Sequence, residues 1–423
     1  MNLVPARPRR KPVGPAAFGA RRPSSAGFTL IELLVAMTAG LFVAVGAFAL
    51  AKQGTRFFQQ EARVANAQFA ATLGFDRLRT DIARAGFLTT ANIRRDPFYC
   101  GDPTVLPVGM KSLAAVRLTA ATPNEAQNAA NGLAPDRITL TGSYGSAEAF
   151  PVRTVVAAAT GYQVYLQSNT GAVARTNNGT TDGGGAIDQV FQAGRVLRIL
   201  DSTGRTEFGR IDAYGLNADG QMVITLHDSP ALAFRKGGGN CGIEGLGVGM
   251  QANVVNFIRY EIRNLRAANL ARYAPLYDTT ATAPGDQSRL ELIRVELDTD
   301  GNEIASSLEL VAEYAVDLRF GLTVVPSYRT PTDPDIASYP IGDARNYNFA
   351  FDVGTNNGVG PERIRAVRAR LVVRSREADR TENLPVTTPG TMFRYAMNGD
   401  GGFARARTIT ADIQLPNLTG VNW

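Results

Sequence analysis

GFTLIELLVAM, residues 27–37, decides the fold of this chain because it opens a long apolar segment. From Phe28 to Ala51 the sequence has 24 residues and one charged side chain, Glu32. A helix of that length spans about 36 Å, whereas the apolar core of a bilayer is about 30 Å thick. The segment therefore predicts a helix that crosses a membrane and carries a single carboxylate.

Glu32 is the unusual residue of this segment. A carboxylate in the middle of a bilayer costs about 2.5–3.5 kcal/mol and is kept mainly where it has a partner. Glu32 lies about 6 Å along the expected helix from Phe28. We therefore expect Glu32 to have a partner once the chain is in the membrane.

The string GFTLIE resembles the class III signal of type IV prepilins and of type II secretion pseudopilins. The resemblance implies that a prepilin peptidase cuts between Gly27 and Phe28 and that the new amino group of Phe28 is methylated. It also implies that Glu32 pairs with the amino terminus of a neighbouring subunit. Such a pair is strong only when its charges are close, so it would set the axial register of each incoming subunit.

Two simpler interpretations of the N-terminus are a conventional signal peptide, cut after the triplet Ala49-Leu50-Ala51, and an uncut signal anchor. The apolar core of a conventional signal peptide is about 7–15 residues long, which is shorter than this run. The length of the apolar run and the GFTLIE string favour the prepilin interpretation.

The leader, residues 1–27, contains six Arg and Lys residues and no acid. The whole chain has a formal net charge of +6, so the chain after Gly27 is neutral. A basic leader next to an apolar segment keeps the leader cytoplasmic and directs the chain beyond the apolar segment to the other side of the membrane. We therefore expect an inner-membrane protein with one membrane span and an exported C-terminal head.

Residues 52–88 continue as an amphipathic helix, because apolar side chains recur at steps of three or four. The apolar stripe slips at Gly74 and then resumes. Its first part is Phe58, Ala62, Ala65, Phe69 and Leu73, and its second part is Phe75, Leu78 and Ile82. We expect the lower half of the helix to form a filament core with neighbouring subunits and the upper half to pack on a β-sheet of its own head.

Residues 89–423 have the texture of an exported β-rich head, with a variable part at 100–285 and a C-terminal antiparallel sheet at 286–423. The expected strands are 115–118, 137–140, 162–166, 196–200, 222–226, 289–297, 308–322, 363–374 and 403–415, and the expected surface loops are 170–185 and 236–249. The predicted fold class is α+β and pilin-like: a long N-terminal helix packed on an antiparallel sheet, with an additional β-rich insertion.

Four segments resemble the PilW group of minor pilins and, more distantly, the J-type pseudopilins: residues 81–87, 310–320, 365–375 and 407–415. The resemblance covers the first quarter and the last third of the chain. It implies a minor pilin that primes a type IV pilus and is incorporated at or near its tip. The implied partners are other minor pilins, the major pilin, the prepilin peptidase, the inner-membrane assembly platform and a large tip adhesin.

Two rival functions share these sequence features. One is a J-type pseudopilin of type II secretion, and the other is a ligand-binding or adhesion module at the pilus tip, built on a pilin scaffold. Six arginines between residues 363 and 376 could follow a phosphate backbone. The neutral mature chain argues against nucleic acid as a partner and favours a solvated strand face balanced by neighbouring acids.

Cys100 and Cys241 both lie in the part that we expect to be exported, where a disulfide is permitted. No other cysteine competes, so we predict that they pair. With His227 as the only histidine, little remains for a zinc site, and we expect neither a metal nor a cofactor. The chain also lacks the recognisable motifs of a hydrolase triad, a zinc protease or a phosphate loop, so we expect no enzymatic activity.

Asp298, Asp300 and Asn302 surround a glycine in the string DTDGNE, as oxygen ligands do in calcium loops. The ligand spacing of an EF-hand is missing. A hairpin turn explains the string better than a calcium loop does.

Overall fold

The computed structural model describes residues 27–120, 131–167, 171, 173, 186–235, 241–246, 249–265, 289–330, 333–351, 360–378, 394–397 and 402–423. Most of the leader and most of the two expected surface loops lie outside these residues. The chain divides into two compact units, residues 1–59 and residues 60–423. Helix α1 (Leu30–Arg84) supplies residues to both units. The second unit, here called the head unit, therefore begins inside the helix and not at residue 89.

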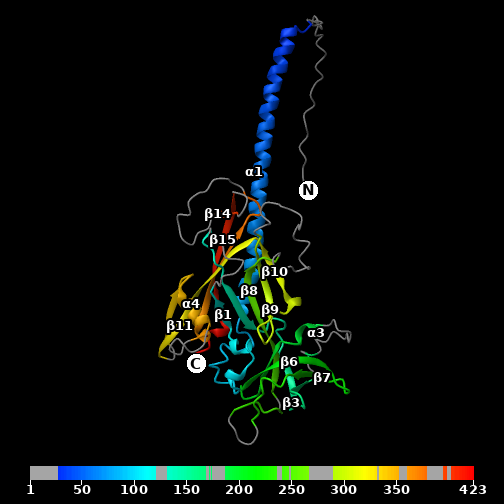
Figure 1. Ribbon diagram of the computed structural model, residues 1–423, viewed down its shortest axis with the longest axis vertical. Helices are drawn as coiled ribbons and strands as arrows, with labels where there is room; N and C mark the ends of the chain where they lie inside the picture. Colours follow the sequence, from blue (N-terminus) through cyan, green and yellow to red (C-terminus); the bar gives the residue numbers. More distant parts are fainter. Residues whose placement is uncertain are drawn as a thin grey trace, which may run out of the picture. The chain divides into compact units, whose positions relative to one another are not determined.

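The fold of the described residues is α+β, as predicted (Figure 1). Ten of the described strands form one antiparallel sheet: β1 (Val116–Thr119), β2 (Arg137–Gly142), β3 (Phe150–Ala157), β4 (Tyr162–Leu166), β5 (Val196–Leu200), β6 (Thr206–Leu216), β7 (Met222–Leu226), β8 (Gln251–Arg263), β9 (Glu291–Leu297) and β10 (Glu309–Glu313).

A second antiparallel sheet has the order β12-β11-β13-β15-β14. Its strands are β11 (Ala315–Thr330), β12 (Asp333–Tyr339), β13 (Ile364–Arg374), β14 (Arg394–Ala396) and β15 (Phe403–Gln414). The short helices whose bounds are described are α3 (Ala186–Val190), α4 (Ala344–Phe351) and the 3-10 helices η1 (Pro103–Val105), η2 (Met110–Ser112), η5 (Ala305–Ser307), η6 (Pro361–Arg363) and η7 (Pro416–Leu418).

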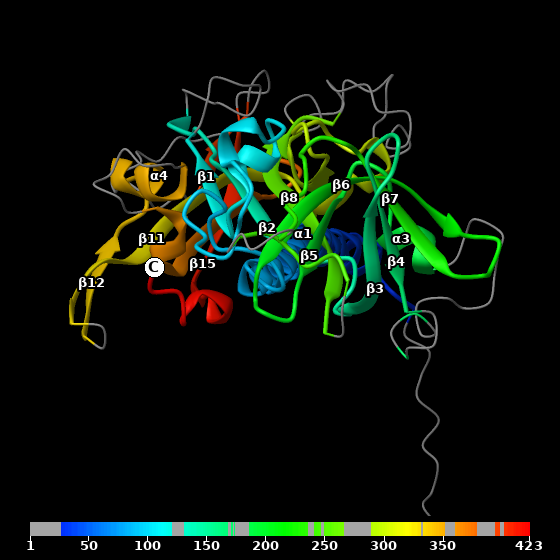
Figure 2. The ribbon, with the colours of Figure 1, turned by 90° about the horizontal axis from the view of Figure 1, so that it is seen from below.

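Six strands of the larger sheet close into a ring, in the order β8-β3-β4-β7-β6-β5 and back to β8. The seam between β3 and β8 is short, with Phe150 opposite Ala252 and Pro151 opposite Gln251. A closed ring of strands leaves no exposed sheet edge. This barrel has its own apolar core, which includes Phe150, Phe191 and Val254. Figure 2 shows β3, β4 and β7 on the side of the head unit opposite to β11 and β12.

Strand β8 belongs to both parts of the head. Its first residues pair with β3 and β5 of the barrel, and residues 256–263 pair with β2 and β9. Because β9 pairs with β8, the sheet crosses residue 286. The expected division into a variable region and a separate C-terminal sheet is therefore not a division between sheets.

The expected strand at residues 308–322 is two strands in two different sheets. Strand β10 pairs with β9, whereas β11 pairs with β12 and β13. Between them Tyr314 adopts a φ of 55°, a conformation that is rare for a bulky side chain. The guanidinium carbons of Arg289 and Arg374 lie 4.8 and 5.1 Å from the centre of its ring. These stacked cations help to hold the chain where it changes sheets.

The two parts of the apolar stripe on α1 have different surroundings. Phe75, Leu78 and Ile82 are 6%, 0% and 0% exposed and lie in the main core, between the two sheets. Phe69 and Leu73 are 67% and 55% exposed. Two residues turn a helix by about 200°, so the slip at Gly74 moves the stripe to the other side. A Cβ on Gly74 would lie 2.7 Å from the Cβ of Ala312 and 3.0 Å from the carbonyl oxygen of Val311, which is why this contact with β10 requires a glycine.

Asp81 fixes α1 to the larger sheet. It is 1% exposed, and one carboxylate oxygen accepts hydrogen bonds from Tyr260 Oη and Arg294 Nε, both at 2.8 Å. Burial and the Asp81 charge raise the pKa of Tyr260 well above its usual range, so this hydroxyl remains a donor. Tyr144 adds a hydrogen bond of 2.8 Å to the Asp81 carbonyl oxygen. These contacts therefore fix the axial position of the helix relative to the larger sheet.

We expect Asp81→Ala to lower the free energy of unfolding by about 3–5 kcal/mol, because it leaves Arg294 buried with reduced compensation. The measurement is denaturant unfolding of the detergent-solubilised chain, followed by the emission of Trp423. Asp76→Ala, at an exposed position on the same helix, is the matched control. Equal effects of the two substitutions would contradict the role of Asp81.

Candidate functional site

The first candidate site is the beginning of α1. Gly27, Phe28 and Thr29 precede the helix, and Phe28 is 82% exposed. The bond between Gly27 and Phe28 therefore lies in non-helical chain, where a protease can bind an extended substrate. The structure places the expected cleavage position directly before the helix.

Glu32 and Thr29 form a reciprocal cap of this helix. One Glu32 carboxylate oxygen accepts hydrogen bonds from the Thr29 backbone N–H and hydroxyl, both at 3.0 Å. The Glu32 backbone N–H donates to the Thr29 hydroxyl oxygen at 3.3 Å. This pattern is a capping box, which satisfies donors that the first turn leaves unpaired. In the uncut chain Glu32 thus has a local partner, Thr29, the residue next to Phe28. This capping role was not predicted, although the pattern T-x-x-E in the sequence is a capping signal.

The first unit exposes the apolar side chains that follow. The large apolar side chains between Leu30 and Leu50 are 56–79% exposed. Helix α1 is long and apolar enough to cross a membrane. Exposed apolar surface on this scale marks a membrane or protein contact.

The second candidate site surrounds the disulfide. Cys100 and Cys241, which the sequence predicted to pair, are joined by an S–S bond of 2.08 Å with their Cα atoms 5.4 Å apart. The bond ties the segment that follows α1 to the connection between β7 and β8. Thr206 at the start of β6 donates its backbone N–H to the Phe98 carbonyl oxygen at 2.9 Å. The disulfide therefore fastens the segment after the helix to the barrel.

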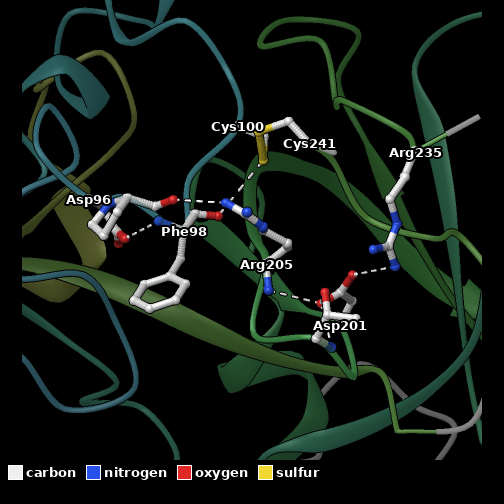
Figure 3. The surroundings of a disulfide bond; sticks show 9 residues. Asp96, Phe98, Cys100, Asp201, Arg205, Arg235 and Cys241 are labelled. Atoms are coloured by element: carbon white, nitrogen blue, oxygen red, sulfur yellow. Dashed lines mark hydrogen bonds and ion pairs between the residues drawn. A yellow bond between two sulfur atoms is a disulfide. The ribbon is translucent and has the colours of Figure 1, made fainter. Parts of the chain in front are cut away.

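Arg205 and Asp201 support the same attachment (Figure 3). Arg205 Nη1 donates to the Pro97 carbonyl oxygen at 2.8 Å. Asp201 Oδ1 accepts from the backbone N–H groups of Thr203 and Arg205 at 2.9 and 2.8 Å, which fixes the turn between β5 and β6. Arg235 Nη2 lies 3.9 Å from Asp201 Oδ2. The contacts of Arg205 with Pro97 and of Arg235 with Asp201 have no signal in the sequence, because each joins segments far apart in the chain.

Glu207 is a buried carboxylate beside this attachment and is 1% exposed. Burial raises its pKa from the ordinary 4.5 to about 8, and a backbone contact with Ala233 offsets only part of the shift. Burial, together with the charge of Glu207, also raises the pKa of Tyr99. The folded chain therefore keeps Glu207 protonated at neutral pH.

Asp298, Asp300 and Asn302 form the turn that follows β9. Asp298 Oδ1 accepts from the backbone N–H groups of Asp300 and Asn302 at 2.9 and 2.8 Å. The Asp300 carboxylate lies 3.5 Å from Arg210 Nη1. The Asp298 carboxylate is thus occupied by backbone donors of its own turn, which supports the hairpin interpretation. Within the described residues, no three His, Cys, Asp or Glu side chains are grouped to hold a metal ion.

Of the six arginines between residues 363 and 376, Arg368 and Arg370 form ion pairs with carboxylates of neighbouring strands. Arg370 pairs with Asp317 at 3.0 Å, as expected for neighbouring strands. Arg368 pairs with Asp412, which lies opposite it on the neighbouring strand β15, at 2.7 Å. Arg374 is fully buried beside Tyr314. Arg374 is therefore part of the packing of the smaller sheet, whereas the half-exposed Arg368 fits the expected solvated strand face.

Comparison with known proteins identifies the first site. A family model described as the prokaryotic N-terminal methylation motif matches residues 22–48. No curated protein and no solved structure matched the chain. The chain therefore carries a class III prepilin-like signal and is pilin-like or pseudopilin-like in its N-terminal segment. Proteins with this motif generally have structural roles, and the signal together with the apolar helix indicates a membrane-anchored protein.

We expect the double substitution Cys100→Ser with Cys241→Ser to lower the free energy of unfolding by about 4–5 kcal/mol, because the disulfide closes a long loop in the unfolded chain. Denaturant unfolding measures this difference. Thiol labelling of the unreduced, denatured protein should find no free cysteine, and two labelled cysteines would refute the pairing.

Glu207 predicts a particular pH dependence of stability. The pKa of Glu207 is higher in the folded chain than in the unfolded chain. Its contribution to the free energy of unfolding is therefore fully present below about pH 4.5 and is lost as the pH rises to about 8. We expect Glu207→Gln to unfold at higher denaturant than the wild type at pH 8, and the difference to shrink toward pH 5. Glu61→Gln, at an exposed position, is the control. A difference that does not change with pH would exclude this role.

Proposed function

We propose that the chain is a minor pilin of the PilW type, which is cut before Phe28, primes assembly of a type IV pilus and stays at or near its tip. Its proposed partners are other minor pilins, the major pilin, the prepilin peptidase, the inner-membrane assembly platform and a large tip adhesin. It would act through protein contacts and reside first in the inner membrane and then at the pilus tip.

The observation that carries this proposal is the change of face at Gly74. Phe75, Leu78 and Ile82 pack in the head's own core, whereas Phe69 and Leu73 remain exposed on a helix that begins with a prepilin-like signal. Exposed apolar side chains at helical spacing fit the packing of one helix on another. Neighbouring subunits of a filament would cover them.

The size of the head unit supports a position at the tip. A compact body of residues 60–423 has a radius of gyration of about 20 Å. Packed helices approach to about 8–10 Å. A head of this breadth on every helix of a filament core would crowd its neighbours, whereas a single copy at the tip is accommodated once. The barrel adds bulk that the helix does not need for its own packing.

A J-type pseudopilin of type II secretion is the rival proposal, since it would share the signal and the helix. Deletion of the gene separates the two: loss of pili supports the minor pilin, and loss of protein secretion with intact pili supports the pseudopilin.

We expect the mature chain to begin at N-methyl-Phe28, and Glu32→Ala to be cut normally but to assemble poorly. The reason is that Glu32 is the only charged side chain of the span and its proposed partner, the new amino group, appears after cutting. N-terminal mass spectrometry and immunoblots of sheared filaments provide the measurements. A mature chain that begins at Lys52, or one that remains uncut, would contradict this prediction.

The tip position is tested by quantifying this chain against the major pilin in sheared filaments. We expect far fewer copies of this chain than of the major pilin, with gold labelling confined to filament ends. A ratio near one, or labelling along the shaft, would overturn the tip position without affecting the cleavage prediction.

A further inference from the structure

A pocket of about 300 Å³ lies at the C-terminal end of α1. Three separate parts of the head unit line it: the segment after the helix, strands β5 and β6 with the turn between them, and the last residues of the chain. Its lining includes Thr89, Asp96, Phe98, Arg198 and Trp423. Its volume is at the lower end of the range for ligand pockets, so it suits a small ligand. We call it the helix-end pocket.

The walls of the helix-end pocket combine aromatic rings with hydrogen-bonding groups. Phe98 is 48% exposed, and Trp423 is the only tryptophan of the chain. Arg198 supplies a positive charge and Asp96 a negative charge to the lining. Burial lowers the pKa of Arg198, and the charge of Asp96 offsets only part of this effect. Because the described lining holds carboxylate groups beside its one cation, it does not select for an anion. It fits a ligand that presents both apolar faces and neutral hydroxyl groups.

Two buried polar atoms of the lining have no hydrogen-bond partner within the described part of the chain. They are Thr89 Oγ1 and Arg198 Nε. Buried polar groups are normally paired, and an unpaired one raises the free energy of the folded state. A ligand with several hydroxyl groups offers both donors and acceptors to such atoms.

The wall that carries Asp96 and Phe98 is held in place before any ligand arrives. Asp96 Oδ1 accepts from the Phe98 backbone N–H at 2.9 Å, and the Phe98 carbonyl oxygen accepts from Thr206. Arg205 holds the intervening Pro97, and the disulfide at Cys100 follows directly (Figure 3). Because this wall is already ordered, binding a ligand loses less conformational entropy.

We propose that the helix-end pocket binds a neutral saccharide of one or two rings. Sugar rings present C–H faces that pack on aromatic side chains and hydroxyl groups that donate and accept, which matches both parts of the lining. A nucleic acid would require a cluster of cations, and the described lining holds one, Arg198. The proposal concerns the head unit alone and does not depend on the tip position.

The test uses the full chain in detergent and a panel of neutral sugars: glucose, galactose, mannose, N-acetylglucosamine, lactose and chitobiose. Sialic acid and an oligothymidylate are added as anionic probes. Because Trp423 lines the pocket, its emission reports binding, and isothermal titration calorimetry provides a readout that does not depend on the fluorophore. We expect at least one neutral sugar to bind saturably and both anionic probes to fail.

The variant Phe98→Ala should weaken binding of that sugar at least tenfold. Phe98 is half exposed, so this variant should keep the unfolding midpoint of the wild type. Phe69→Ala is the matched control, since it removes an exposed ring of α1 outside the pocket and should leave sugar affinity unchanged. Arg198→Gln should also weaken binding. Failure of all neutral sugars in calorimetry, binding of the anionic probes alone, or equal affinity of Phe98→Ala and wild type would each overturn the proposal.

Discussion

One helix, α1, has to present apolar side chains in two directions, and the rest of the structure depends on this constraint. Its second stripe, from Phe75 to Ile82, packs in the main core of the head, while Phe69 and Leu73 remain exposed. Gly74 permits the close contact with β10 at the point where the face changes. Asp81 then fixes the axial position of the helix through Tyr260 and Arg294.

In the head unit, a barrel is attached to a sheet that also packs on α1. Strand β8 belongs to both, so the barrel and the remaining strands of the larger sheet share one continuous set of backbone hydrogen bonds. The disulfide adds a covalent attachment between the segment after α1 and the barrel. Ligand sites often occur where two structural parts meet, and the helix-end pocket lies at this junction.

Local pattern was enough to predict the helix and several strands. Strands β4, β5 and β7 have the bounds that their apolar runs indicated, and α1 departs from the expected helix by a few residues at each end. Tyr314 shows where such reasoning fails, because a positive φ at a tyrosine has no sequence signal and turned one expected strand into two. Barrel closure is also invisible in sequence, since Phe150 and Ala252 meet only after folding.

The candidate functional segments also differ in how far they could be predicted from the sequence. The residues from Gly27 to Glu32 are contiguous, so the motif can be read from the sequence, and the family match covers them. The shift of the apolar stripe at Gly74 was visible in the sequence. Which side of the helix is buried and which is exposed became clear only from the structure. Asp81 could have been suspected, because it stands beside Ile82 on the buried stripe. The helix-end pocket could not, since Thr89, Arg198 and Trp423 are brought together only by the fold.

We propose that the exposed face of α1 binds other pilin-type subunits while the opposite face packs on the chain's own head. This division can be tested with a photocrosslinking amino acid placed at Phe69, and separately at Phe75, in cells that assemble filaments. We expect adducts with other subunits from position 69 that disappear without the prepilin peptidase, and none from position 75. Absence of adducts from position 69, or equal adducts from both positions, would show that the two faces do not have these separate roles.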